Sequence, residues 1–210
     1  MGKEKKEIEP KISKEDIKAQ NKTLKNIFIG LGVIVFIIAV VILSINSAKH
    51  FEYNGVEFKV IQEGEIIFYN AVFPLYQGMT GKHIADYNIY LRNSPKKLEK
   101  VVFDGEVNLK PDTVINTTVN FNCDGDGVIA IANLAQVLET FGTNVIKNPE
   151  IGCDAPRNEY VFIQIREGNE TRIEQFAPTC YNFYVNDCEI LEVTEKFIVD
   201  LLVEAEKNRA

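Results

Sequence analysis

An uninterrupted apolar segment near the start of the chain constrains its fold more than any other feature. From Ile27 to Ile45 the sequence reads IFIGLGVIVFIIAVVILSI, nineteen residues without a charge. A helix with a rise of 1.5 Å per residue would be roughly 28 Å long here, which matches the hydrocarbon core of a bilayer. Apolar residues would lie on all sides of this helix, whereas a helix of a soluble core has a polar face. The sequence therefore predicts a transmembrane helix at residues 27–45.

The charges on either side of this segment predict its orientation. Residues 1–26 contain eight Lys and five Asp or Glu, a net charge of +3, and residues 46–210 contain fifteen Lys or Arg and twenty-five Asp or Glu, a net charge of −10. Basic residues near a membrane helix favour the cytoplasmic side. We therefore expect a single-pass protein of the cell membrane, with its N-terminus in the cytoplasm and residues 46–210 outside.

A cleaved signal peptide is the alternative interpretation of the same segment. Ser44, Ser47 and Ala48 are small residues of the kind found near cleavage sites. The apolar segment is nevertheless longer than the usual signal, and a long polar leader precedes it. A retained signal-anchor is the favoured prediction.

The chain divides into three regions on these grounds. Residues 1–26 mix Lys and Glu with few large apolar residues and are expected to be a disordered cytoplasmic tail. Residues 27–45 form the transmembrane helix, and residues 46–210 are enough for one extracytoplasmic domain with its own core. The anchor implies membrane lipid as a partner, whereas the acidic outer domain excludes nucleic acid, whose phosphates require clustered Lys and Arg.

Residue patterns in the outer domain predict an α+β fold, with a mostly antiparallel sheet and two main helices. Alternating apolar residues predict strands within 51–73, with Asn54-Gly55 as a hairpin turn and Pro74 as a strand end, and further strands at 85–91, 101–103, 113–121 and 181–185. A polar stretch between 160–165 and 171–177 predicts a hairpin of those two strands. Apolar residues at helical spacing predict helices at 128–141 and from about residue 189 onward. Strands and helices without regular alternation favour α+β.

All four cysteines follow the membrane segment. An even number of cysteines on the oxidising side of a membrane predicts disulfides, so we expect two bridges among Cys123, Cys153, Cys180 and Cys188. Their pairing stays open, with one restriction. If 181–185 is an extended strand, its ends lie well over about 15 Å apart, too far for Cys180 to bridge Cys188.

Other motifs carry weaker chemical signals. Asn122, Asp124 and Asp126 alternate as in a calcium loop, but Asn133 stands where such a loop has a bidentate Glu, and an ordinary turn with a helix cap explains the same residues. The sequons at Asn116 and Asn169 are glycosylation candidates, with Asn169 favoured because it lies in a predicted turn. No motif predicts a cofactor.

These patterns do not identify a reaction. His83 and Ser94 are among the few candidates for a nucleophile and base, and no Gly-x-Ser-x-Gly motif is present. We therefore expect a non-enzymatic, membrane-anchored module that binds a protein or an envelope component. A pilin-like or envelope structural subunit, and an anchored hydrolase, are the alternative hypotheses.

Overall fold

The computed structural model describes residues 14–77, 81–148 and 150–209, which form two units, one ending at Ala48 and one beginning at Lys49. The first unit is helix α1 (Lys14–Ala48), in which Leu24–Leu43 is long and apolar enough to cross a membrane. Residues 14–26 were expected to be disordered and are helical instead. They are rich in good helix formers, and extending an existing helix avoids the cost of nucleation. Residues 1–13 of the predicted tail lie outside the described residues.

Sheet A opens the second unit and has the order β1-β2-β3-β4. Its strands are β1 (His50–Tyr53), β2 (Val56–Glu63), β3 (Ile66–Tyr76) and β4 (His83–Leu91), and all neighbours are antiparallel. The predicted turn at Asn54-Gly55 joins β1 to β2, and both residues have the positive φ that this turn requires. The prediction that a strand ends at Pro74 is wrong, because β3 continues through this residue to Tyr76.

Sheet B has the order β5-β9-β10-β8-β6-β7. Its strands are β5 (Val102–Asp104), β6 (Asp112–Thr117), β7 (Asn144–Ile146), β8 (Val161–Glu167), β9 (Arg172–Ala177) and β10 (Cys180–Val185). The β9–β10 pair is antiparallel, and the other neighbours are parallel. The predicted hairpin of residues 160–165 with 171–177 is wrong, because β10 lies between β8 and β9.

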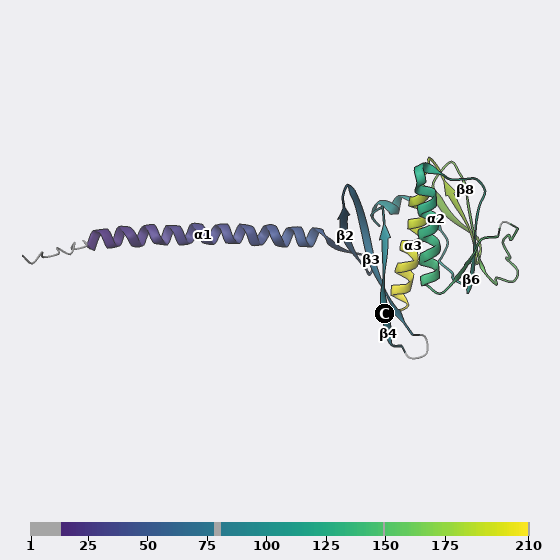
Figure 1. Cartoon of the computed structure of the whole chain (residues 1–210), viewed down its shortest axis with the longest axis horizontal. Coiled ribbons are helices and arrows are strands. Elements are labelled where there is room, and N and C mark those ends of the chain that lie inside the picture. Colours follow the sequence, from purple (N-terminus) through teal and green to yellow (C-terminus); the bar gives the residue numbers. More distant parts are fainter. Residues whose placement is uncertain (1–13, 78–80, 149, 210) are drawn as a thin grey trace, which may run out of the picture. The chain divides into compact units, whose positions relative to one another are not determined.

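Two helices fill the space between the sheets, as Figure 1 shows. Helix α2 (Asp126–Thr140) connects β6 to β7, and helix α3 (Ile190–Lys207) follows β10. The buried residues of α3 lie on all sides of the helix and join the cores of both sheets in one hydrophobic cluster. Short 3-10 turns η1 (Lys97–Lys100) and η2 (Cys123–Gly125) precede β5 and α2. The predicted α+β class is confirmed, with the difference that its second sheet is mainly parallel.

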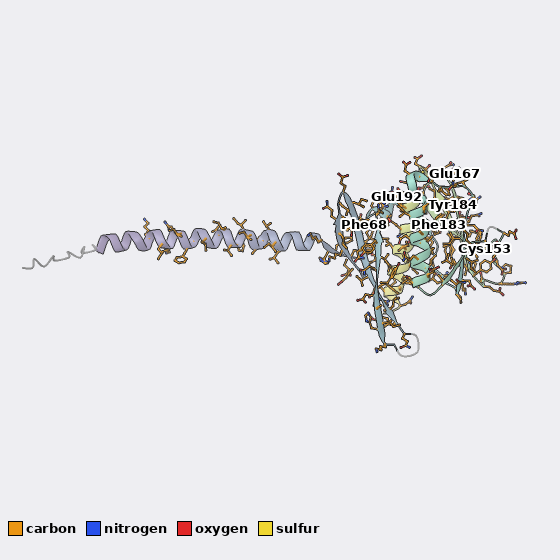
Figure 2. All side chains as sticks on the ribbon, viewed as in Figure 1. Phe68, Cys153, Glu167, Phe183, Tyr184 and Glu192 are labelled. Carbon is orange, nitrogen blue, oxygen red and sulfur yellow. A yellow bond between two sulfur atoms is a disulfide. The ribbon has the colours of Figure 1, made fainter. Side chains whose placement is uncertain are left out.

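Aromatic packing at the centre of the domain joins α3 to sheet B. The ring of Phe197 lies 5.3 Å from the rings of both Tyr181 and Phe183 and 5.9 Å from that of Phe103, measured between centroids. In Figure 2, Phe183 lies between Phe68 of sheet A and Cys153 on the far side of sheet B. This cluster fixes α3 against β5 and β10 of sheet B.

Candidate functional site

A groove of 760 Å³ opens where β2 and β3 separate. The β2–β3 ladder ends at the pair Phe58 and Ala71, although β3 runs on for five more residues. Continuing the register would place Pro74 opposite Gly55. Proline has no N–H to donate, and Gly55 belongs to the β1–β2 turn, so no ladder bond can form there. The groove is lined by His50, Phe51, Glu52, Gly55, Val56, Glu57, Phe58, Lys59, Asn70, Val72, Pro74, Glu206 and Arg209.

Backbone groups of both strands face into this groove. Successive residues of a strand direct their peptide groups to opposite sides. Because the N–H of Val60 donates to Lys49 O on the β1 side at 2.8 Å, the peptide groups of Glu57 are directed toward β3. The same alternation directs those of Val72 toward β2. The last ladder pair includes the bond from Val72 N–H to Glu57 O, so the Glu57 N–H and the Val72 carbonyl are the groups left available to a ligand.

The last turn of α3 closes one side of the groove. Arg209 Nη2 donates to Pro74 O at 3.1 Å, and its guanidinium carbon lies 4.2 Å from the centroid of the Phe73 ring. Arg209 Nη1 also lies 3.5 Å from Glu206 Oε2. Arg209 therefore binds a carbonyl of β3 beyond the end of the ladder, where β2 no longer pairs with it.

The lining combines an apolar interior with a charged rim. Phe58 and Val56 are buried, and the rim carries the carboxylates of Glu52, Glu57 and Glu206. Two cations, Lys59 and Arg209, partly balance these three carboxylates. The groove is thus suited to an apolar or neutral-to-basic chain, and a strongly acidic ligand would be repelled.

A separate cluster of buried polar groups surrounds Glu195 on α3. This side chain is only 1% exposed, and its carboxylate accepts hydrogen bonds from Arg92 N at 2.5 Å, Asn93 N at 2.9 Å and Asn93 Nδ2 at 2.9 Å. Burial raises the pKa of Glu195 to about 7, against the lowering effect of these donors. Lys97 Nζ joins the cluster by donating to Asn93 Oδ1 at 2.7 Å and to Glu192 Oε1 at 3.3 Å. The cluster fixes the turn after β4 to α3 and has a structural role.

The hydrolase candidates from the sequence do not come together. His83 Nε2 lies 2.7 Å from Asp86 Oδ1 at the start of β4, and both side chains are about half exposed. Ser94 lies beyond the other end of β4, where its Oγ accepts a hydrogen bond from Lys97 N at 3.2 Å. An extended strand advances about 3.3 Å per residue, so the length of β4 separates His83 from Ser94. The pair cannot act together as base and nucleophile.

Both predicted disulfides are present. Cys123 bridges Cys188, and Cys153 bridges Cys180, with Cα atoms 5.6 Å and 5.9 Å apart. As predicted, Cys180 does not bridge Cys188, because β10 is extended and keeps the two residues apart. The first bridge joins the segments that precede α2 and α3. The second ties the 147–160 region to the outer face of sheet B, where Cys180, Val114 and Phe162 form a second small core.

The weak calcium candidates form a turn that starts α2. Asp124 and Gly125 have positive φ, Gly125 is the residue that caps the helix, and Asp126 is the first helical residue. Asp126 Oδ1 lies 4.0 Å from Arg92 Nη1. Among the described residues, no group of three or more His, Cys, Asp or Glu could hold a metal ion. Asn122, Asp124 and Asp126 are therefore explained by the turn.

The two sequons differ in their surroundings. Asn116 lies in β6, and its Nδ2 donates to Ile151 O at 2.9 Å, so its amide is already engaged in the folded domain. Asn169 is exposed in the connection between β8 and β9. That connection is no hairpin turn, but it is accessible, and Asn169 stays the better candidate.

The groove itself was not found from the sequence. Its residues come from β1, β2, β3 and the end of α3, and only their pairing in space brings them together. The available signal was Pro74, which lies in a segment with strand-like alternation. This proline was interpreted above as the end of a strand. A proline in a non-terminal strand also marks a place where the ladder is broken.

The chain matches no protein-family model, no curated protein and no solved structure. Its function is therefore inferred from the groove and from the arrangement of the chain around it.

Proposed function

We propose that the protein is a membrane-anchored module whose outer domain binds an extended polypeptide segment of a partner protein in the groove between β2 and β3. The observation that carries this proposal is the early end of the β2–β3 ladder, which leaves the Glu57 N–H and the Val72 carbonyl directed into a groove of 760 Å³. Extended peptides are commonly bound by adding hydrogen bonds to such unpaired strand segments, while pockets beside the strand select side chains.

Three features of the groove support a polypeptide over a small ligand. Donors and acceptors come from the backbone of both strands, which suits another backbone. The side chain of Val72, which is 52% exposed, offers apolar contact to an aliphatic or aromatic side chain. The three carboxylates at the rim favour a partner segment that carries Lys or Arg.

The anchor, the charges and the disulfides support a location of the module outside the cytoplasm. The apolar part of α1, Leu24–Leu43, has the length of a membrane span, and the excess of Lys before it favours a cytoplasmic N-terminus. Two disulfides in the following domain are typical of an oxidising compartment. We infer that α1 is retained as a signal-anchor and that the domain is outside the cytoplasm.

A photo-crosslinking experiment in the native cell tests the proposal. A photoreactive amino acid is placed at Val72, which is 52% exposed and lines the groove, or at Ile129 of α2, which is 45% exposed and serves as the matched control. The proposal predicts a covalent adduct with a partner protein at position 72 that is missing at position 129. Mass spectrometry then identifies the partner segment. Adducts with the same protein in equal yield at positions 72 and 129 would contradict specific binding of the partner in the groove.

A second step measures binding of that segment to the purified full chain. Glu57→Pro removes the N–H that faces the groove, while the bonds between β2 and β1 come from the neighbouring residues. Glu57→Ala keeps the N–H, lacks the same carboxylate and is the control. We expect Glu57→Pro to bind the synthetic peptide about tenfold more weakly than Glu57→Ala does, the effect of losing one well-formed hydrogen bond and its neighbours. Equal affinity for both variants would refute strand addition in the groove.

A further inference from the structure

The strand β4 lies at the edge of sheet A and has a strand partner on one side only among the described residues. Tyr90 O accepts a hydrogen bond from Asn133 Nδ2 of α2 at 3.3 Å, on the side away from β3. By the alternation of a strand, the peptide groups of Asn88 and Asp86 point in the same direction as those of Tyr90. They form an open edge of the kind that pairs with another strand.

The pairing geometry of this edge is self-complementary. In an antiparallel pair of two identical strands, the residue numbers of opposed residues add to a constant, and a two-fold axis passes through the centre. An axis through Tyr87 places Asp86 opposite Asn88 twice, so each carboxylate meets a neutral amide. An axis through Asp86 would oppose two carboxylates, which is unfavourable.

Apolar side chains favour the same register. Ile84 is 65% exposed and Tyr90 is 44% exposed, and with the axis at Tyr87 they lie at the same end of the paired segment, one from each copy. An axis through Asn88 would instead oppose Asp86 to Tyr90. The register that suits the charges therefore also covers the two exposed apolar side chains of this strand.

We propose that two copies of the chain associate through antiparallel pairing of their β4 strands, with the two-fold axis at Tyr87. The edge that takes part is short, because Asn133 covers Tyr90 O at one end and the β3–β4 register shifts near Ile84 at the other. Such a contact is smaller than that of a stable soluble dimer. Anchoring of both copies in one membrane raises their effective concentration, and this allows a short edge contact to be populated.

Disulfide trapping in lipid vesicles tests the register. Both native disulfides occupy all four cysteines, so Tyr87→Cys adds a single thiol to the full chain. At the two-fold axis this residue forms a non-hydrogen-bonded pair with its copy, with Cα atoms about 4.5 Å apart, within the range for a disulfide. Ile67→Cys, on β3 of the same sheet, is the control for random collision. It is exposed, whereas Tyr87 is half-buried, so accessibility alone favours the control.

The expected result is cross-linking of Tyr87→Cys at least about tenfold faster than of Ile67→Cys. Adding Asn88→Asp opposes two carboxylates at each of two positions, and we expect it to weaken association roughly two- to thirtyfold. A further Asp86→Lys change restores opposite charges and should restore the cross-linking rate. This rescue separates a loss of pairing from a loss of folding.

Three outcomes would overturn the proposal. Equal rates for the two cysteine variants would show collision without pairing. An unchanged rate with Asn88→Asp, or no rescue by Asp86→Lys, would show that the strands do not meet in this register. None of these results depends on the groove between β2 and β3.

Discussion

Replacing Glu195 with Gln should remove a pH dependence of the stability that the buried carboxyl imposes. Burial raises the pKa of Glu195 from its ordinary value of 4.5 to about 7 in the folded protein. Between these two pH values the folded state holds the proton more tightly than the unfolded state does. The stability associated with this group is therefore fully present below pH 4.5 and is lost as the pH rises through 7.

The magnitude follows from the size of the shift. The difference between 4.5 and about 7, at 1.36 kcal/mol for each pH unit, amounts to about 3 kcal/mol. Glu195→Gln has no proton to lose, so the difference in unfolding free energy between the wild type and this variant should shift by about 3 kcal/mol in favour of the variant from pH 4.5 to pH 8. At pH 4.5 the variant should be the less stable of the two, because its amide N–H group faces the donors Arg92 N and Asn93 N.

Urea unfolding of the full chain in a neutral detergent, followed by near-UV circular dichroism of the tyrosines, measures these free energies. Glu139→Gln is the matched control, because Glu139 is exposed on α2. The difference in unfolding free energy between Glu139→Gln and the wild type should change little with pH. A difference in unfolding free energy between Glu195→Gln and the wild type that is constant from pH 4.5 to pH 8, or that moves in favour of the wild type, would contradict a raised pKa of Glu195 in the folded protein.

Three further outcomes are expected. Phe197→Ala should destabilise the domain by about 3 to 5 kcal/mol, since it removes the ring at the centre of the aromatic cluster; a loss under about 1 kcal/mol in urea unfolding would contradict the packing described. Removing the Cys123–Cys188 bridge with two serines should cost about 2 to 4 kcal/mol, measured in the same way, and an unchanged midpoint would argue against the bridge. In a host that glycosylates, Asn169→Gln should abolish a glycan mass that Asn116→Gln leaves in place, and the reverse pattern would contradict the accessibility of the two sites.

Local patterns predicted most elements of the outer domain. The hairpin at Asn54-Gly55 and the helix after Asp187 carry their signals within a few residues, so they were found. The predicted strand at 113–121 is shorter, because its pairing ends near Thr117. Strand β7 was not predicted, and its residues form a strand through parallel pairing with β6, which is distant in the sequence.

Pairing over long distances could not be predicted in the same way. Residues between Glu167 and Arg172 have the composition of a hairpin turn, yet the neighbour of β8 is β10. The choice depends on which strand buries its apolar face against α3, and that is decided by the whole core. The same holds for the groove, which needs Pro74, Gly55 and Arg209 together. The parallel pairs of sheet B were unexpected for this reason, although the α+β class was predicted.

The intact mass of the full chain, purified from its native membrane and alkylated before or after reduction, tests the central claim most directly. An anchored domain in an oxidising compartment predicts the mass of the complete sequence, no alkylation before reduction and four alkylated cysteines after it. Four free thiols before reduction, or a chain that has lost the segment containing Leu24–Leu43, would contradict a membrane-anchored binding module outside the cytoplasm.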